Sequence, residues 1–234
     1  DEDADIEDIV EDLQALPEVE YAEPDIQGKV EPPEEEKPTE RTFPISDRGK
    51  YVIPNDPDYA KQWGLEKIRA PYAWKQRTDG QDVIVAIVDT GVDYNHPDLK
   101  DNILRDKAGK VVGYNFVRKN TNPMDGKKGH GTHCAGIAAA VGNNGIGGAG
   151  VGWHVKIMPV KSLSDFGTGF SEDMADGVVW AADHGARVIS NSWGSPWMPR
   201  TVREAIRYAQ RKGAIVIAAA GNNNTERKFY PAAY

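Results

Sequence analysis

One acidic residue directly follows one of the longest apolar runs in the chain. The run occupies residues 83–88 and is rich in β-branched side chains, and Asp89 comes next. A carboxylate at the end of a buried strand is unfavourable unless another group partners it. A histidine would be the natural partner and would make Asp89 a catalytic group. Without one, Asp89 would more often be a turn residue or a helix cap.

Two histidines, His130 and His133, lie three residues apart where a helix is predicted to begin. They could ligate a metal, but the third ligand of a zinc site is missing from the pattern. The alternative is a general base at the helix start, flanked by glycines that let a substrate backbone approach. His130 suits that position, and His133 would then pack on the other side.

A third candidate is Asn222, which follows a strand that ends in small residues, 218–221. Its side-chain amide could donate a hydrogen bond to a developing oxyanion beside an open surface. Taken alone, a Gly-Asn turn after a strand is the simpler interpretation.

The elements that must position these residues alternate between strands and helices, which predicts an α/β fold with parallel strands and right-handed crossovers. In such sheets the active site lies at the carboxyl ends of the strands, where all three candidates fall. Thr201 is the expected cap of the last helix and Gly213 its expected end. Strands are predicted at 83–88, 156–160, 187–190 and 214–220, and helices at 131–140, 171–184 and 201–212.

The charge divides the chain into two parts. Residues 1–50 hold 18 acidic and 5 basic residues, a net charge of −13, whereas residues 51–234 hold 18 and 23, a net charge of +5. The acidic front could dock on the basic body or remain a solvated tail. Basic residues are scattered rather than striped, which argues against nucleic-acid binding. No apolar run reaches the length of a membrane span.

Within the front, helical spacing of apolar residues predicts a helix ended by Pro17, and residues 19–22 alternate as a strand does. The Pro- and Glu-rich residues 29–50 predict an extended linker.

The chain has one cysteine, Cys134, so an intramolecular disulfide within these 234 residues is excluded. It could be a nucleophile, but an Ala/Gly-rich helix favours a small buried apolar side chain.

Three motifs in this order resemble the subtilisin family of serine proteases: Asp89-Thr90-Gly91, Gly129-His130-Gly131-Thr132-His133 and Ala219-Ala220-Gly221-Asn222. The resemblance implies a three-layer fold with a mainly parallel central sheet, whose C-terminal portion would lie beyond Tyr234. It also implies a serine endopeptidase in which Asp89 orients His130, His130 activates a serine, and Asn222 binds the oxyanion. The family's serine follows its Asn, so we expect it beyond Tyr234 and expect these 234 residues alone to be inactive.

The resemblance extends to substrate binding. Gly167-Thr168-Gly169 and Ser192-Trp193-Gly194 resemble strands that flank an extended peptide and pair with its backbone, which implies broad specificity. The segments 192–194 and 219–221 would wall the main specificity pocket. Trp193 favours an apolar pocket, unless it simply packs.

A calcium site is implied by the thermitase branch of the family. Asp56, Asp98 and Asn144 would bind by side chain, and Ile146 and Gly148 by backbone carbonyl, an oxygen-rich set that suits Ca²⁺. Otherwise these are turn and loop residues. Where that branch has another calcium loop, this chain has Arg118-Lys119-Asn120.

The front resembles the end of a subtilase propeptide, on the segment Leu16 to Asp25. This implies three parts: residues 1–28 as the end of an inhibitory propeptide, 29–50 as linker, and 51–234 as the first part of a catalytic domain. We therefore expect a secreted zymogen whose leader is removed, acting on polypeptides and inhibited by its own propeptide. The alternatives are a peptide-binding module without a serine and a regulator of another protease.

Overall fold

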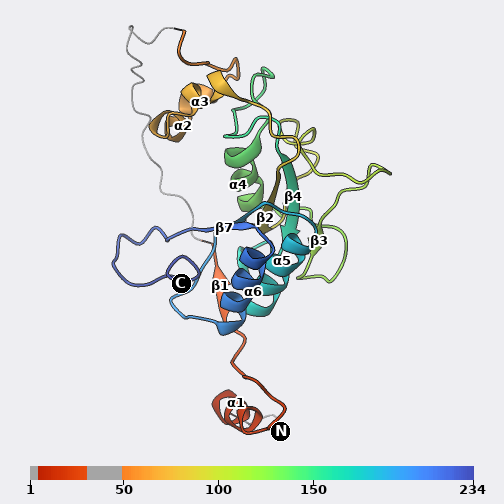
Figure 1. Ribbon diagram of the computed structural model, residues 1–234, viewed down its shortest axis with the longest axis vertical. Helices are drawn as coiled ribbons and strands as arrows, with labels where there is room; N and C mark the ends of the chain where they lie inside the picture. The colour runs from red at the N-terminus through yellow and green to blue at the C-terminus, as the bar shows by residue number, and fades with distance from the viewer. Residues whose placement is uncertain (1–4, 31–48) are drawn as a thin grey trace.

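A computed structural model of the protein describes residues 5–30 and 49–234, so most of the predicted linker, 31–48, lies outside it. A five-stranded sheet forms the centre, in the order β3-β4-β2-β6-β7, and all its neighbouring strands are parallel (Figure 1). This confirms the predicted α/β fold. The strands are β2 (Ile84–Asp89), β3 (Tyr114–Asn115), β4 (Lys156–Lys161), β6 (Val188–Asn191) and β7 (Ile215–Ala218).

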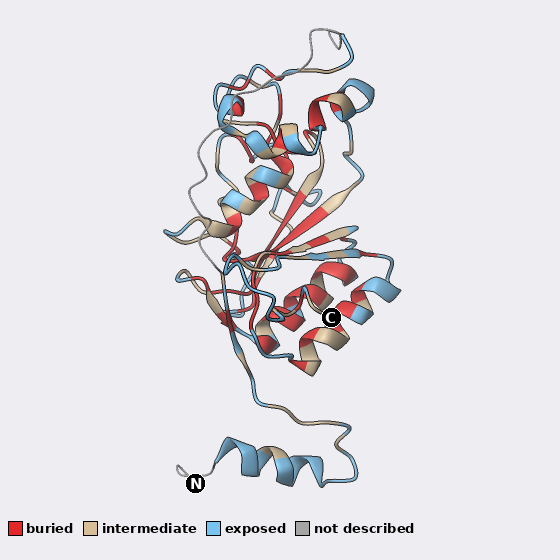
Figure 2. Ribbon diagram, turned by 90° about the vertical axis from the view of Figure 1, so that its left-hand side faces the viewer, coloured by how far each residue is buried: buried red, intermediate tan, exposed pale blue. Residues whose placement is uncertain are grey.

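Strand β2 lies in the middle of the sheet because both of its faces are apolar. Val85 and Ile87 join an apolar cluster with α4 on one face, and Ala86 and Val88 join a second cluster with α5 and α6 on the other. Figure 2 shows helices on both faces, with their buried residues turned towards the sheet. The three helices are α4 (His130–Ala139), α5 (Ser171–Asp183) and α6 (Arg200–Arg211).

The N-terminus of α6 differs from the prediction. The cap position is Pro199, and Thr201 is already helical, so Thr201 is not the cap. The hydrogen-bond acceptor that a cap residue would supply comes instead from Glu23, far away in the sequence. At the other end Gly213 has φ +88°, which fits its predicted role as the helix stop.

Short elements before β2 pack into a separate apolar cluster. Its centre is Trp74, whose ring centroid lies 4.9 Å from that of Trp153. This cluster holds the chain that precedes β2 against the loop after α4. The elements are η2 (Tyr59–Lys61), α2 (Trp63–Lys67) and α3 (Ala70–Gln76).

The N-terminal segment runs from an isolated helix into the body. Helix α1 (Ile6–Gln14) is as predicted, has no buried residue and lies apart from the body (Figure 1). The predicted strand at residues 19–22 is wrong. The strand is β1 (Gln27–Lys29), which pairs antiparallel with β5 (Thr168–Phe170). Its partner comes from the body, so local alternation could not reveal it.

None of the helices in residues 5–30 and 49–234 is long and apolar enough to cross a membrane.

Candidate active site

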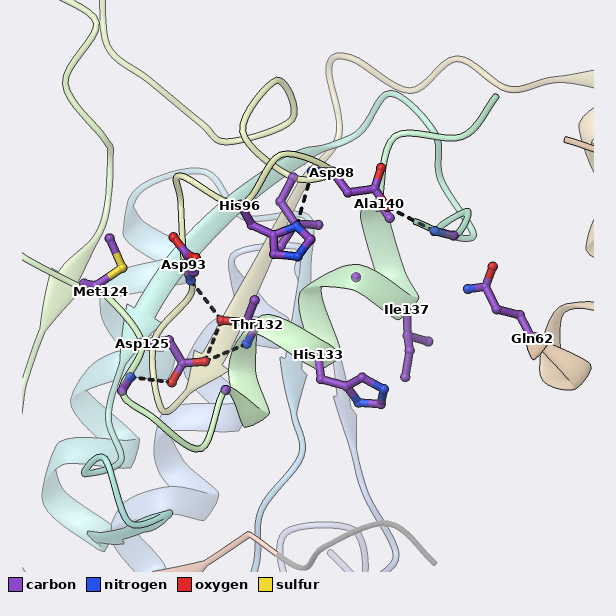
Figure 3. A pocket seen from close by; sticks show the side chains of 15 residues that line it. Gln62, Asp93, His96, Asp98, Met124, Asp125, Thr132, His133, Ile137 and Ala140 are labelled. Carbon is purple, nitrogen blue, oxygen red and sulfur yellow. Dashed lines mark hydrogen bonds between the residues drawn. The ribbon is translucent and has the colours of Figure 1, made fainter. Parts of the chain in front are cut away.

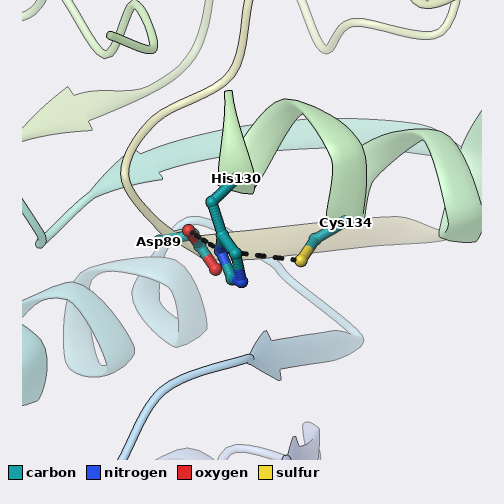
Figure 4. A group of neighbouring side chains, drawn as sticks. All are labelled: Asp89, His130 and Cys134. Atoms are coloured by element: carbon teal, nitrogen blue, oxygen red, sulfur yellow. Dashed lines mark hydrogen bonds and ion pairs between the residues drawn. The ribbon is translucent and has the colours of Figure 1, made fainter. Parts of the chain in front are cut away.

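Asp89 and His130 meet where the central strand ends and α4 begins. The His130 Nδ1 lies 2.7 Å from the Asp89 Oδ1, which also accepts the backbone N–H of Thr90 at 2.7 Å (Figure 4). Asp89 is only 1% exposed, so its charge needs these partners. The predicted pairing of these two residues is therefore present.

The environment favours the protonated form of His130. Burial disfavours the imidazolium, but the hydrogen bond to Asp89, the contact with Cys134 and the charge of Asp89 all favour it. Together they raise the pKa of His130 from 6.5 to about 10. The same interactions would stabilise the imidazolium that forms when the ring accepts a proton.

Gly131 allows the close approach of α4 to the end of β2. A Cβ on this residue would lie 2.1 Å from the carbonyl oxygen of Gly91 and 3.0 Å from the Cβ of Asp89. Any side chain there would push the helix, and His130 with it, away from the strand. The glycine next to His130 is thus required by packing.

A second acidic residue, Asp125, links the segment of Asp89 to that of His130, and the sequence analysis did not identify it. It accepts the hydroxyl of Thr90 at 2.7 Å and both the N–H and the hydroxyl of Thr132, at 2.9 and 2.6 Å. Thr90 in turn accepts the N–H of Gly131 at 2.9 Å. The signal was the pair of threonines that follow Asp89 and flank His130, which need an acceptor when they are buried.

Cys134 lies beside His130. Its Sγ is 3.9 Å from the His130 Nδ1, and the side chain is only partly buried (Figure 4). The expectation of a purely apolar packing residue is therefore corrected. One helical turn separates His130 from Cys134, and this i, i+4 spacing could have predicted the contact.

His133 belongs to a different surface of α4. It is exposed and, with His96 and Asp98, lines a cavity of about 550 Å³ between α4 and the loop after β2 (Figure 3). The two histidines therefore do not share one ligand position, in agreement with the assignment of His130 alone to the Asp89 pair.

The two predicted substrate edges flank one extended segment, which belongs to the chain itself. Gly28 pairs with Gly169, and the Val30 N–H donates to the Gly167 carbonyl at 2.9 Å. On the other side Lys29 and Gly194 exchange two backbone hydrogen bonds, of 3.3 and 3.1 Å. The cleft between the edges is thus able to bind a peptide through its backbone.

Trp193 and the end of β7 complete this region. The Trp193 indole is 2% exposed and its N–H donates to the Val88 carbonyl at 2.8 Å, so the ring packs into the core as well as bordering the cleft. Ala220 and Gly221 line a cavity of about 820 Å³ together with Lys29. Ala219 donates its N–H to Asn191 at 3.0 Å, and Ser192 and Thr168 lie beside the paired glycines. Asn222 follows on an exposed bend, and its role as oxyanion donor stays a prediction.

The five predicted calcium ligands form one connected group. The two oxygens of Asp56 accept the N–H groups of Asn143 and Asn144, at 2.7 and 2.9 Å. Asp98 accepts the Asn144 amide at 2.8 Å and the Gly148 N–H at 3.2 Å. The Ile146 N–H closes the group by donating to the Asn144 Oδ1 at 2.8 Å.

Both carboxylates of this group are 4% exposed. Burial raises the pKa of Asp98, the hydrogen bonds from Asn144 and Gly148 lower it, and the charge of Asp56 raises it, for a net rise. Two neighbouring buried acids of this kind would be stabilised by a cation.

The comparison with known families decides the identity. The profile described as "Subtilase family" matches residues 80–234, which include Asp89, His130 and Asn222. The chain belongs to the subtilase family.

Individual relatives agree with this assignment. Thermitase of Thermoactinomyces vulgaris is 46% identical over 77% of this chain and 62% of its own length. The thermophilic serine proteinase of Bacillus sp. (strain AK1) is 43% identical over 77% of the chain and 43% of its own length. Fervidolysin of Fervidobacterium pennivorans is 35% identical over 94% of the chain, so this match extends into the N-terminal segment, and it covers 32% of that protein. The subtilase chain thus spans less than two thirds of the length of these relatives.

Proposed function

We propose that the protein to which this chain belongs is a serine endopeptidase. The observation that carries the proposal is the 2.7 Å contact between His130 Nδ1 and Asp89 Oδ1, at the end of the central strand of a subtilase fold. Asp89 holds the ring in one orientation and engages Nδ1, which leaves Nε2 to act on a nucleophile.

The reaction follows from this geometry. The His130 Nε2 takes the proton of a serine hydroxyl as the serine oxygen attacks the peptide carbonyl. The imidazolium, stabilised by Asp89, then delivers the proton to the leaving amine. Asn222 donates to the oxyanion of the tetrahedral intermediate. In this proposal the serine follows Asn222 in the chain, in the Asp-His-Ser order of the family.

In this proposal, peptide substrates bind between residues 167–169 and 192–194, with residues 219–221 forming a further wall of the cleft. The backbone hydrogen bonds made by residues 28–30 at these edges support this assignment. The protein acts outside the cell. One relative, from Natrialba magadii, is named a halolysin-like extracellular serine protease.

The N-terminal segment is the end of a propeptide that inhibits the enzyme in cis. Two of its carboxylates support this role, because they satisfy the first N–H groups of two helices, where a negative charge is favourable. Glu23 accepts the N–H groups of Arg200 and Thr201 of α6, at 2.7 and 2.6 Å. Asp25 accepts the N–H of Glu172 at 3.0 Å and the hydroxyl of Ser171 at 2.7 Å, at the start of α5.

Arg200 adds a third anchor for the same segment. Its guanidinium lies 4.1 Å from the centre of the Tyr21 ring and forms an ion pair of 3.1 Å with Glu20. The acidic front thus docks on the body at the two helix starts, and the β1 pairing then leads the chain into the cleft.

A structural calcium ion belongs to the proposal as well. The donor set consists of Asp56, Asp98, the amide oxygen of Asn144 and the carbonyls of Ile146 and Gly148, which is the oxygen-rich chemistry that Ca²⁺ takes. The net rise in the pKa of Asp98, to which the charge of Asp56 contributes, fits a site that a cation stabilises. The ion would fasten the segment before α2 to the loop after α4.

The test is hydrolysis of a peptide substrate by the full-length protein. His130→Ala is expected to lower kcat by about 10³-fold to 10⁶-fold. The matched control is His133→Ala, which alters a histidine on the other surface of α4 and is expected to leave kcat close to that of the wild type. Equal activity of the wild type and His130→Ala would contradict the proposal.

The second candidate function is a peptide-binding module. The observation that favours it is that the cleft holds an extended segment by backbone hydrogen bonds, which requires no chemistry. Tight binding of unstructured peptides by the full-length protein without any hydrolysis would support it over the protease.

A further inference from the structure

A lysine lies buried at the end of β4, beside the end of the strand that holds Asp89. Lys161 is 2% exposed, and it is the register partner of Asp89 in the parallel pairing of β2 with β4. A lysine is almost never fully buried unless its charge is paired. Its ammonium donates to the Oδ1 of Asp165 at 2.7 Å and to the backbone carbonyl of Thr90. The first contact balances the charge, and the second reaches the residue that follows Asp89.

The Thr90 carbonyl lies where the backbone pairing of β2 with β4 ends. The carbonyl of Asp89 still accepts the N–H groups of Ser162 and Leu163, at 3.0 and 3.1 Å. Thr90 is 0% exposed, so its carbonyl depends on a donor from the protein, because a buried carbonyl without a donor is unfavourable. The ammonium of Lys161 supplies that donor.

Thr90 in turn fixes the carboxylate of Asp89. Its N–H donates to the Asp89 Oδ1 at 2.7 Å, and the same oxygen lies 2.7 Å from the His130 Nδ1. The N–H and the carbonyl of Thr90 belong to adjacent planar peptide groups, so a contact at each one fixes the backbone of this residue on both sides. While the carbonyl is held, the N–H keeps its direction towards the Asp89 oxygen.

We propose that Lys161 is a positioning residue for the pair of Asp89 and His130 and acts through the carbonyl of Thr90. The inference rests on the proposed function and deepens it, because it adds a residue that controls the same site. Proton transfer by His130 depends on the orientation of the imidazole, which Asp89 sets. Without the ammonium, the peptide group after Thr90 is free to rotate, and the Asp89 oxygen loses its fixed place.

Lys161→Met tests this role in the full-length protein, by hydrolysis of a peptide substrate. Methionine keeps an unbranched side chain without the ammonium. The Asp165 carboxylate that loses its partner is 39% exposed, so water can solvate it and the variant avoids an unpaired buried charge. We expect kcat to fall about 10-fold to 100-fold, the cost of a small misplacement of the reacting groups, with KM unchanged.

Two controls separate positioning from the loss of a charge. Lys156→Met makes the same change at the other end of β4, where the Nζ donates to the Asp101 carbonyl at 3.2 Å, and should leave kcat unchanged. Asp165→Asn removes the charged partner but keeps the contact of Lys161 with Thr90, and it should leave kcat close to that of the wild type. A kcat of Lys161→Met equal to that of Lys156→Met, or an equal fall in Asp165→Asn, would overturn the proposal.

An NMR measurement distinguishes positioning from a loss of stability alone, and it does not require hydrolysis. The resonance of the His130 Nδ1 proton reports its hydrogen bond to Asp89. It should shift in Lys161→Met and stay unchanged in both controls, whereas a lower Tm alone would not move it. An unshifted resonance in Lys161→Met would overturn the proposal.

The wild type provides a second NMR test that does not depend on the folding of a variant. A scalar coupling across the hydrogen bond, between the Lys161 Nζ and the carbonyl carbon of Thr90, should be observed, and its absence would overturn the proposal. Either failure would leave the protease proposal standing. If the wild type did not hydrolyse peptides, the protease proposal would fail, while the two NMR results would still support or overturn the role of Lys161.

Discussion

Asp89 and Asp98 are both almost fully buried carboxylates, 1% and 4% exposed, yet they lie in opposite kinds of surroundings. Asp89 faces a histidine that can carry a positive charge. Asp98 faces a second acid, Asp56, and is balanced by an amide and a backbone N–H group. The difference teaches that a buried charge with a titratable partner is suited to proton transfer, whereas a buried charge held by fixed dipoles is suited to structure or to a cation.

The largest expected effect is the loss of activity when the charge of Asp89 is removed. Asp89→Asn keeps the size of the side chain but no longer holds His130 in the required tautomer, so kcat/KM of the full-length protein should fall about 10⁴-fold. The measurement is peptide hydrolysis under subsaturating conditions.

Asp101→Asn is the control, because it makes the same change at an exposed position. If Asp89→Asn hydrolysed peptides at the rate of this control, the assignment of Asp89 to proton transfer, in contrast to Asp98, would be contradicted.

The second prediction concerns stability, and it applies to the other acid. A cation present at about 100 times its Kd stabilises the fold by about 2.7 kcal/mol, so chelation should lower the Tm of the full-length protein by about 5–10 °C. In Asp56→Asn and Asp98→Asn, chelation should have little further effect. Thermal unfolding with and without a chelator measures this.

The control is Asp58→Asn, which changes an exposed acid paired with Lys61 at 2.7 Å. Its sensitivity to chelation should match that of the wild type. A wild-type Tm that does not respond to chelation would contradict a calcium site at Asp56 and Asp98. The two acids would then be residues of a hydrogen-bonded loop only.

The parts of the site that could be predicted from the sequence are those marked by local patterns. Asp89 follows a continuous apolar strand and His130 begins a glycine-flanked helix, and the order of these motifs with that of Asn222 assigned both residues through the family resemblance. Parallel strands then brought both to the same edge of the sheet. The same logic predicted the sheet, since β2 and β4 are apolar on both faces.

The parts that could not be predicted depend on groups distant in the sequence. Strand β1 has no apolar alternation of its own. Its pairing partners, residues 168–170 and Gly194, belong to the body and are distant from it in the sequence. Thr201 was assigned as a cap from local preference, but Glu23 supplies the acceptor. Asp125 was missed because its importance lies in the groups that it contacts, which are distant in the sequence or have no motif of their own.

A third prediction uses pH to sharpen the contrast between the two acids. The folded state raises the pKa of His130 from 6.5 to about 10, so folded protein keeps a proton that the unfolded chain releases above pH 6.5. The stabilisation from this pair is therefore complete below pH 6.5 and is lost as pH rises towards 10. The slope should be at most about 1.4 kcal/mol per pH unit.

Denaturant unfolding at a series of pH values measures that slope. Asp89→Asn removes the charge that raises the pKa of His130 and should flatten the curve over this range, whereas Asp98→Asn should not. An unchanged slope in Asp89→Asn would mean that the ion pair does not control the proton on His130.

The smallest expected effect concerns a third acid, the half-buried Glu23, whose partner is a helix terminus. Glu23→Ala leaves the N–H groups of Arg200 and Thr201 without their acceptor, and the loss of a helix cap costs about 0.5–2 kcal/mol. The amides of these two residues should then exchange with solvent about 2-fold to 30-fold faster. Glu18→Ala, at an exposed position of the same segment, should leave their exchange unchanged. Glu23 is bound by backbone dipoles and a hydroxyl, as Asp98 is by an amide and a backbone N–H. An effect of Glu23→Ala as large as that of Asp89→Asn would show that fixed dipoles can contribute as much energy as a charged partner. The distinction between Asp89 and Asp98 would then fail.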